Sequence, residues 1–266
     1  MFRRSFGGLQ MGMQIEAFIC RSDNYCVLIH DDETGVTAAV DAPDGDAILS
    51  QLKAKGWGLD LLFITHHHGD HVAGNIALKK ATGCTIIGPQ KEAKSIPGIG
   101  RTVADGEAVE IGAHSFSVIE TPGHTTGHVA YWCEGSGLIF VGDTLFSLGC
   151  GRLFEGTAAQ MFASLGRLAT LPRETVLYCG HEYTADNARF ALTIEPKNLD
   201  LEARAEEVGR LRSGGQNTLP TTIGQELATN PFLRTNKRRL RTAIGMQSDA
   251  PEAVFAELRH RKDNFS

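Results

Sequence analysis

The sequence predicts an α/β fold in which a mixed domain of strands and helices is followed by a helical region. The composition, 42% hydrophobic and 21% charged residues in a chain of 266, is that of a globular protein. The first two-thirds of the chain alternate short apolar runs with helical patterns, whereas from about Tyr183 onward the strands cease and only helical patterns continue. We therefore expect two domains, at residues 1–182 and 183–266.

The expected elements follow from the apolar runs, the helical periods and the residues that end them. Strands are expected at residues 14–20, 25–30, 36–41, 61–65, 85–87, 116–120, 129–133, 138–142 and 176–179. Helices are expected at residues 44–55, 72–81 and 158–169, and in the second domain at 184–195, 198–212, 221–229 and 250–262. Glycine or proline stands shortly after most of these helices, and both residues favour helix ends.

Charge and cysteine usage narrow the class of protein. The formal net charge of −5 argues against a general nucleic-acid binder, and no apolar run approaches the roughly 18–20 residues that cross a bilayer. The six cysteines form no C-x-x-C pair, so we expect them to be reduced and mostly buried in a cytoplasmic protein. The charge is uneven, because residues 231–266 carry eight Lys/Arg and four acids, about +4, against −9 elsewhere. Taken alone, such a basic tail is most often a solvated helix face.

A histidine-rich segment, THHHGDH at residues 65–71, follows an apolar run and precedes a predicted helix. Imidazole and carboxylate are ligands suited to zinc or iron. Because side chains of an extended backbone alternate between its two faces, His66 and His68 point one way and His67 the other. Asp70 and His71 then lie at the turn into the helix, so one loop can serve two metals.

Three other predicted strands end in a loop where a glycine directly precedes His124, Asp143 or His181. A glycine there lets the backbone approach a metal closely, and such loops converge if the strands share sheet edges. One tetrahedral ion would leave some of these residues unused, so we expect two ions. The expected ligands are His66, His68 and His124 for one ion and Asp70, His71 and His181 for the other, with Asp143 shared.

A lone buried histidine is more often a hydrogen-bonded core residue than a ligand. Seven matched residues in four similarly placed loops are much harder to explain in that way. The other histidines lack this context. We expect His30, His114 and His260 at the surface, His67 bonded away from the metals, and His128 as a structural hydrogen-bond partner.

The ligand set resembles the binuclear metal signature of the metallo-β-lactamase superfamily, and the finer resemblance is to its hydroxyacylglutathione hydrolase family, also called glyoxalase II. The similarity runs from residue 13 onward. It is carried by residues 65–71, 121–128, 142–156 (GDTLFSLGCGRLFEG), 179–184 (CGHEYT), 230–234 (NPFLR) and 262–265 (KDNF). The resemblance implies an αβ/βα metallo-β-lactamase-type sandwich with an all-helical C-terminal domain that binds glutathione.

The activity that the resemblance implies is hydrolysis of S-2-hydroxyacylglutathione, typically S-D-lactoylglutathione, to glutathione and a 2-hydroxy acid, a step in methylglyoxal detoxification. A metal-bridged hydroxide is the implied nucleophile, with Asp143 and Asp70 as catalytic ligands. The residues implied to bind glutathione are Arg152, Tyr183, Arg259 and Lys262. Many members have lysine in place of Arg152, tyrosine in place of Phe154 and a bulkier residue in place of Gly69.

Other readings remain open at this point. An iron-dependent persulfide dioxygenase of the same superfamily would use His66, His124 and Asp143 as a facial triad, but the long tail ending in KDNF is not expected there. Ribonuclease-type relatives and a non-enzymatic metal-binding protein are further alternatives. For the hydrolase we expect two divalent ions, zinc first and iron or manganese as alternatives, a small glutathione thioester as the only partner, no membrane contact, and a monomer.

Overall fold

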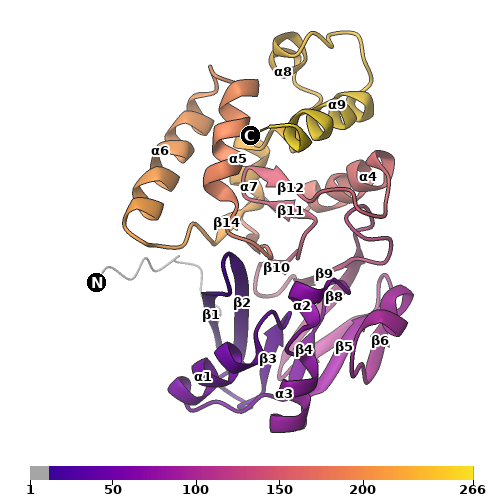
Figure 1. The fold of residues 1–266 in the computed structure, drawn as a ribbon, viewed down its shortest axis with the longest axis vertical. Helices are drawn as coiled ribbons and strands as arrows, with labels where there is room; N and C mark the ends of the chain where they lie inside the picture. Colours follow the sequence, from indigo (N-terminus) through magenta and orange to yellow (C-terminus); the bar gives the residue numbers. More distant parts are fainter. Residues whose placement is uncertain (1–11, 266) are drawn as a thin grey trace.

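A computed structural model describes residues 12–265 of the chain (Figure 1). The start of the expected first domain, residues 1–11, therefore lies outside the described residues. Most of the strands belong to two six-stranded sheets. The first sheet has the order β1 (Met13–Cys20), β2 (Asn24–Asp31), β3 (Thr37–Val40), β4 (Leu61–Phe63), β5 (Thr85–Pro89) and β6 (Arg101–Val103). The second has the order β14 (Thr221–Thr222), β13 (Val176–Tyr178), β10 (Leu138–Phe140), β9 (Val129–Cys133), β8 (His114–Glu120) and β7 (Ala108–Ile111).

Both sheets are mixed. Strands β1 to β3 pair antiparallel and β3 to β6 pair parallel, whereas in the second sheet only β10 and β13 are parallel. The chain crosses from the first sheet to the second between β6 and β7 through a turn at Gly106, whose φ of 80° favours glycine. A separate two-stranded ribbon, β11 (Leu145–Phe146) with β12 (Gly149–Cys150), follows β10.

The sheets pack face to face, and helices cover their outer faces. The core between the sheets contains the buried aromatic residues Phe63, Phe116, Tyr131 and Phe140. The outer face of the first sheet is covered by α1 (Gly45–Lys55) and α3 (Asn75–Thr82). The second sheet packs against α4 (Ala158–Ala169), α5 (Thr184–Ile194), α7 (Ile223–Thr229) and α9 (Pro251–Asp263). The expected αβ/βα sandwich is confirmed.

The remaining helices connect these layers or extend the C-terminal region. They are α2 (Gly69–Val72), α6 (Leu199–Ser213), α8 (Arg238–Ala243) and the two 3₁₀ helices η1 (Gln90–Ser95) and η2 (Pro231–Leu233). In Figure 1 the C-terminal helices gather beyond one end of the sandwich.

All nine expected strands are present, but the prediction that strands cease after Tyr183 is wrong at one place. Residues of β14 pair with β13, so the C-terminal region adds an edge strand to the second sheet. The expected helix at 72–81 is also interrupted. A Cβ on Gly74 would lie 2.7 Å from the Gly45 nitrogen, because these two segments pack backbone to backbone. The short α8 was not predicted.

The prediction that all six cysteines are reduced is wrong for two of them. Cys20 and Cys26 form a disulfide, and the other four cysteines are free and buried. The two residues lie near the end of the β1–β2 hairpin with their Cα atoms 6.2 Å apart, within the usual range for a bridged pair. The C-x₅-C spacing alone does not determine this distance, because it depends on the register of the hairpin.

Within residues 12–265, every helix is too short or too polar to cross a lipid bilayer.

Candidate metal centre

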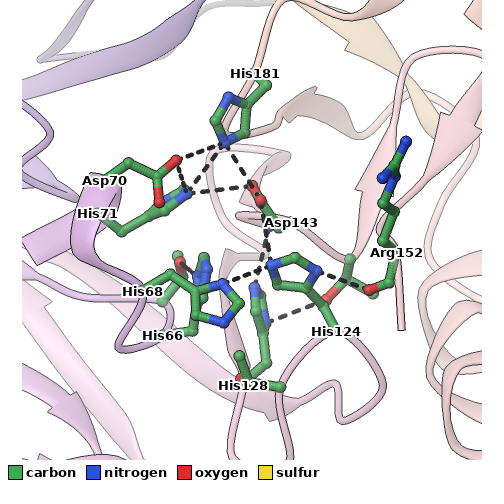
Figure 2. Close-up of polar contacts among 12 residues, drawn as sticks. His66, His68, Asp70, His71, His124, His128, Asp143, Arg152 and His181 are labelled. Atoms are coloured by element: carbon green, nitrogen blue, oxygen red, sulfur yellow. Dashed lines mark hydrogen bonds and ion pairs between the residues drawn. The ribbon is translucent and has the colours of Figure 1, made fainter. Parts of the chain in front are cut away.

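The loops that follow β4, β8, β10 and β13 meet at one edge of the sandwich, and α2 adds the remaining side chains (Figure 2). All seven residues expected as metal ligands point into this edge. Five of them are buried, namely His66, His71, His124, Asp143 and His181; His68 and Asp70 are partly exposed. Residues from four segments far apart in sequence are thus brought together as expected.

The first cluster consists of His66, His68 and His124. His68 Nδ1 lies 2.9 Å from His124 Nε2, and the Asp143 Oδ2 atom lies 3.4 Å from the same His124 nitrogen. The other ring nitrogen of His124 hydrogen-bonds to the Arg152 carbonyl at 2.8 Å. This bond fixes the ring so that Nε2 faces the cluster.

The second cluster consists of Asp70, His71 and His181. The Nε2 atoms of His71 and His181 are 3.2 Å apart, and Asp70 Oδ2 lies 3.4 Å from His181 Nε2. Asp143 lies between the two clusters, because its Oδ1 is 3.5 Å from His71 Nε2 and its Oδ2 is 3.3 Å from His181 Nε2. Figure 2 shows this central position of Asp143.

Two buried polar atoms at the centre support metal binding. His66 Nε2 and Asp143 Oδ1 have no hydrogen-bond partner although both are shielded from solvent. A buried polar group without a partner is costly, and ring nitrogens that face each other need a cation or a shared proton between them. Divalent ions would satisfy these atoms together, so the donor set fits a binuclear metal site.

Electrostatics separate the histidines into two kinds. Burial lowers the pKa of His66 and of His124, so their imidazoles are neutral and ready to bind a metal. Burial also opposes charge on His181, but the nearby Asp143 and Asp70 carboxylates outweigh it and raise its pKa to about 10. The pKa of His71 is raised in the same way by the Asp143 and Asp41 carboxylates. The metal-free site therefore carries protons that a bound cation would displace.

Several supporting residues were not found by sequence reasoning. Asp41 Oδ2 lies 2.8 Å from His71 Nδ1 and also accepts from the Thr65 hydroxyl. Buried Glu92 accepts from the His67 backbone nitrogen and from the Thr125 hydroxyl, and so joins the loops that carry the first cluster. These carboxylates stand alone in the sequence, at the end of an expected strand or outside any motif. Only the tertiary structure identifies them.

The histidines outside the ligand set largely follow expectation. His67 Nδ1 bonds Glu92 at 2.8 Å, away from the clusters. Buried His128 accepts from the Asp143 backbone nitrogen at 3.1 Å, which confirms its structural role. His260 is exposed and His114 is half-buried. His30 is also half-buried rather than fully at the surface, because its ring stacks on Trp57.

Both clusters open into a cavity of about 520 Å³, in the range typical of small-molecule sites. The four residues expected to bind glutathione, Arg152, Tyr183, Arg259 and Lys262, all line it. Arg152 is exposed, whereas Arg259 is buried and donates to the Cys150 carbonyl and to Asp263. Lys262 pairs with Asp186, and the Tyr183 ring stacks on His181 at 4.7 Å between ring centroids. A second hollow, of about 1000 Å³ near α8, contains none of the expected site residues.

The fold and the site together define a metallo-β-lactamase superfamily protein, and a family model of that description matches residues 21–181. A second model, described as the hydroxyacylglutathione hydrolase C-terminus, matches residues 182–265. Among curated proteins, the hydroxyacylglutathione hydrolases of Brucella ovis and Brucella abortus are each 56% identical to this chain over 257 residues. These alignments cover 97% of this chain and 100% of each relative. The chain belongs to the hydroxyacylglutathione hydrolase family.

Solved structures agree with this fold. ETHE1 from Myxococcus xanthus superposes with a TM-score of 0.65 and 26% identity, covering 95% of this chain and 100% of that one. TTHA1623 in a di-iron-bound form superposes with a TM-score of 0.58 and 25% identity, covering 79% of this chain and 95% of that one.

Proposed function

We propose that the protein hydrolyses S-2-hydroxyacylglutathione thioesters, with S-D-lactoylglutathione as the typical substrate, to glutathione and a 2-hydroxy acid. The observation that carries the proposal is that both ligand clusters open into the same cavity as Arg152, Arg259 and Lys262. A cavity with metal ligands at one end and cations at the other suits a thioester attached to a carrier with two carboxylates. The family's name supports the same activity.

The cofactor of this proposal is a pair of divalent ions. His66, His68 and His124 would hold one, Asp70, His71 and His181 the other, and Asp143 would be shared. Zinc is the metal that we propose first, because nitrogen and carboxylate oxygen are its common ligands. Iron and manganese accept the same donors, and TTHA1623 is a similar protein in a di-iron-bound form.

Bound divalent ions polarise a thioester carbonyl and lower the pKa of water toward neutrality. Hydrolysis forms a bond between the water oxygen and the acyl carbon and breaks the carbon–sulfur bond. Glutathione leaves as a thiolate. Because the pKa of a thiol is near 8.5, no strong general acid is required.

Two aspartates have the roles closest to the reacting atoms. A hydrogen bond with His181 is the largest influence on Asp70 and holds its pKa below the usual range, so the carboxylate stays ionised at neutral pH. Its side chain is 41% exposed and faces the cavity, where it can accept a hydrogen bond from the attacking water. Asp143 is buried between the clusters and contacts both, through His71 and His124.

The opposite end of the cavity would bind the glutathione moiety. Lys262 and Arg152 offer cationic groups to its carboxylates, and Tyr183 offers a hydroxyl and a ring face. Arg259 adds charge from a buried position, where its bonds to Cys150 and Asp263 also hold the cavity wall. We place the boundary between the catalytic and the glutathione-binding parts at residues 182 and 183.

The direct test is turnover of S-D-lactoylglutathione by the metal-loaded protein, compared with oxygen consumption on glutathione persulfide. The proposal predicts release of one glutathione thiol per thioester and no oxygen uptake. Oxygen uptake on the persulfide without thioester hydrolysis would overturn it in favour of the dioxygenase. An Asp143→Ala variant provides the background rate.

A further inference from the structure

Within residues 12–265, the turn between β1 and β2, residues 21–23, and the first residue of β2, Asn24, hydrogen-bond to candidate ligands of the second cluster only. Asp23 Oδ1 lies 2.8 Å from His181 Nδ1, and the Asn24 side-chain amide donates to Asp70 Oδ2 at 3.1 Å and to the Asp70 carbonyl at 3.2 Å. The Nδ1 atoms of His66 and His124 in the first cluster bond elsewhere, to the Thr65 hydroxyl and to the Arg152 carbonyl.

The contact with Asp23 determines which nitrogen of His181 is free. An ionised carboxylate only accepts hydrogen bonds, so Nδ1–H faces Asp23, and the proton that His181 must lose when a metal binds is the one on Nε2, which faces Asp70 and Asp143. Removing a carboxylate that orients a metal-binding histidine in this way typically weakens metal affinity about 10–100-fold. Asp23 is therefore a positioning residue.

The backbone holds the turn against the same loop. The Glu182 nitrogen donates to the Asp23 carbonyl at 2.9 Å, and the Tyr25 nitrogen donates to the Gly180 carbonyl at 2.8 Å. The two bonds flank His181 on both sides. Any shift of the turn therefore moves the groups that orient His181 and Asp70 together.

A covalent bond closes this turn. The Cys20–Cys26 disulfide spans residues 21–25, and both cysteines are buried. Closing a loop restricts the conformations of the residues inside it. The disulfide thus restrains Asp23 and Asn24, although within residues 12–265 neither cysteine hydrogen-bonds to a ligand candidate.

We propose that the disulfide-closed turn controls the occupancy of one of the two metal positions, the one formed by Asp70, His71 and His181. The oxidised turn holds Asp23 and Asn24 on their ligands. Reduction to two thiols frees the turn and selectively lowers metal affinity at this position. The inference rests on the two-metal centre of the proposed function.

The test counts metal on the whole protein. Wild type, Asp23→Ala and the double variant Cys20→Ser/Cys26→Ser are loaded with zinc and equilibrated with a chelator at graded concentrations. The retained equivalents are then measured by elemental analysis. Asp32→Ala is the matched control, because it removes an exposed acid at the other end of the same hairpin. Wild type is also treated with a trialkylphosphine, which becomes its oxide with oxygen from water as the disulfide becomes two thiols.

We expect wild type and Asp32→Ala to retain two equivalents at chelator concentrations where both test variants retain one. One position should bind about 10–100-fold more weakly in the variants, and the other should be unchanged. The phosphine should lower retention in wild type but leave the double variant as it was. Asp23→Asn should recover part of the affinity, because its amide oxygen still accepts from His181.

A purely structural effect would lower the affinities of both metal positions together. That result would overturn the inference, as would wild-type retention of both ions by either test variant. If wild type itself binds fewer than two ions, the two-metal centre fails, and this inference fails with it.

Discussion

Lys262 offers the sharpest test of the glutathione end of the cavity. Its ammonium group pairs with Asp186, lies over the rings of Phe190 and Phe265, and is only 11% exposed. If Lys262 binds a carboxylate of glutathione, Lys262→Ala should raise KM and leave kcat nearly unchanged. Loss of an interaction that is equal in the ground state and the transition state has this effect.

The expected magnitude follows from exposure. A hydrogen bond to a charged group contributes about 1.5–3 kcal/mol, and we take the lower end because Lys262 must share its charge with Asp186. That energy corresponds to roughly a tenfold increase in KM. The Arg152 side chain is 64% exposed, so solvent screening reduces its contribution to about 0.2–1 kcal/mol. Arg152→Ala should therefore raise KM only about 1.5- to 5-fold.

The assay is steady-state hydrolysis of S-D-lactoylglutathione and, in parallel, of a small thioester without glutathione. The small thioester should be insensitive to Lys262→Ala, because it does not extend to α9. Arg261→Ala is the matched control, since it removes a neighbouring cation that pairs with Glu257 outside the cavity. An unchanged KM for the glutathione substrate, or an equal loss with the small thioester, would refute the assignment of Lys262.

Three further predictions concern the centre and the fold. Asp143→Ala should abolish hydrolysis, with a circular dichroism spectrum that still shows a folded protein. His67→Ala should retain much of the activity, because His67 bonds Glu92. Equal losses of kcat/KM in the two variants would contradict this difference. Below pH 10 the affinity of the metal-free protein for zinc should rise roughly tenfold per pH unit for each proton displaced, because His181 must lose its proton. A zinc affinity that does not change with pH in chelator competition would contradict this prediction. Burial opposes charge on Asp31, but hydrogen bonds from Thr34, Glu33 and Ala113 lower its pKa to about 2. The ionised Asp31 therefore stabilises the fold above about pH 3.8, and this stabilisation is lost as the pH falls through 2. Asp31→Asn should accordingly reduce the free energy of unfolding in urea by about 2 kcal/mol at neutral pH and by much less near pH 2, and an equal reduction at both pH values would argue against it.

Much of the fold could be predicted because its strands and helices carry strong local signals. The helix at residues 158–169 has its expected bounds, set by a capping box at Thr157 and Gln160. The strands β6, β7, β11, β12 and β14 were missed because none of them contains three consecutive apolar residues. The equally short β4, β10 and β13 each consist of such a run. The break at Gly74 depends on contact with Gly45, which no local pattern reports.

The convergence of the seven candidate ligands could be predicted because each follows a strand end, often after glycine, and parallel strand ends meet. The residues that hydrogen-bond to these candidate ligands could not be predicted from the sequence. Asp23 and Asn24 reach His181 and Asp70 across more than 40 residues of sequence, and their turn carries no metal-binding pattern. The Cys20–Cys26 bond likewise depends on hairpin register.

The most direct test of the binuclear hydrolase is a titration of the metal-free protein with zinc in which bound metal and S-D-lactoylglutathione hydrolysis are measured on the same sample. We expect a plateau at two equivalents per chain, with hydrolysis developing as the ions bind, because seven donors around a shared Asp143 fit two ions. A plateau at one equivalent together with oxygen consumption on glutathione persulfide would contradict it.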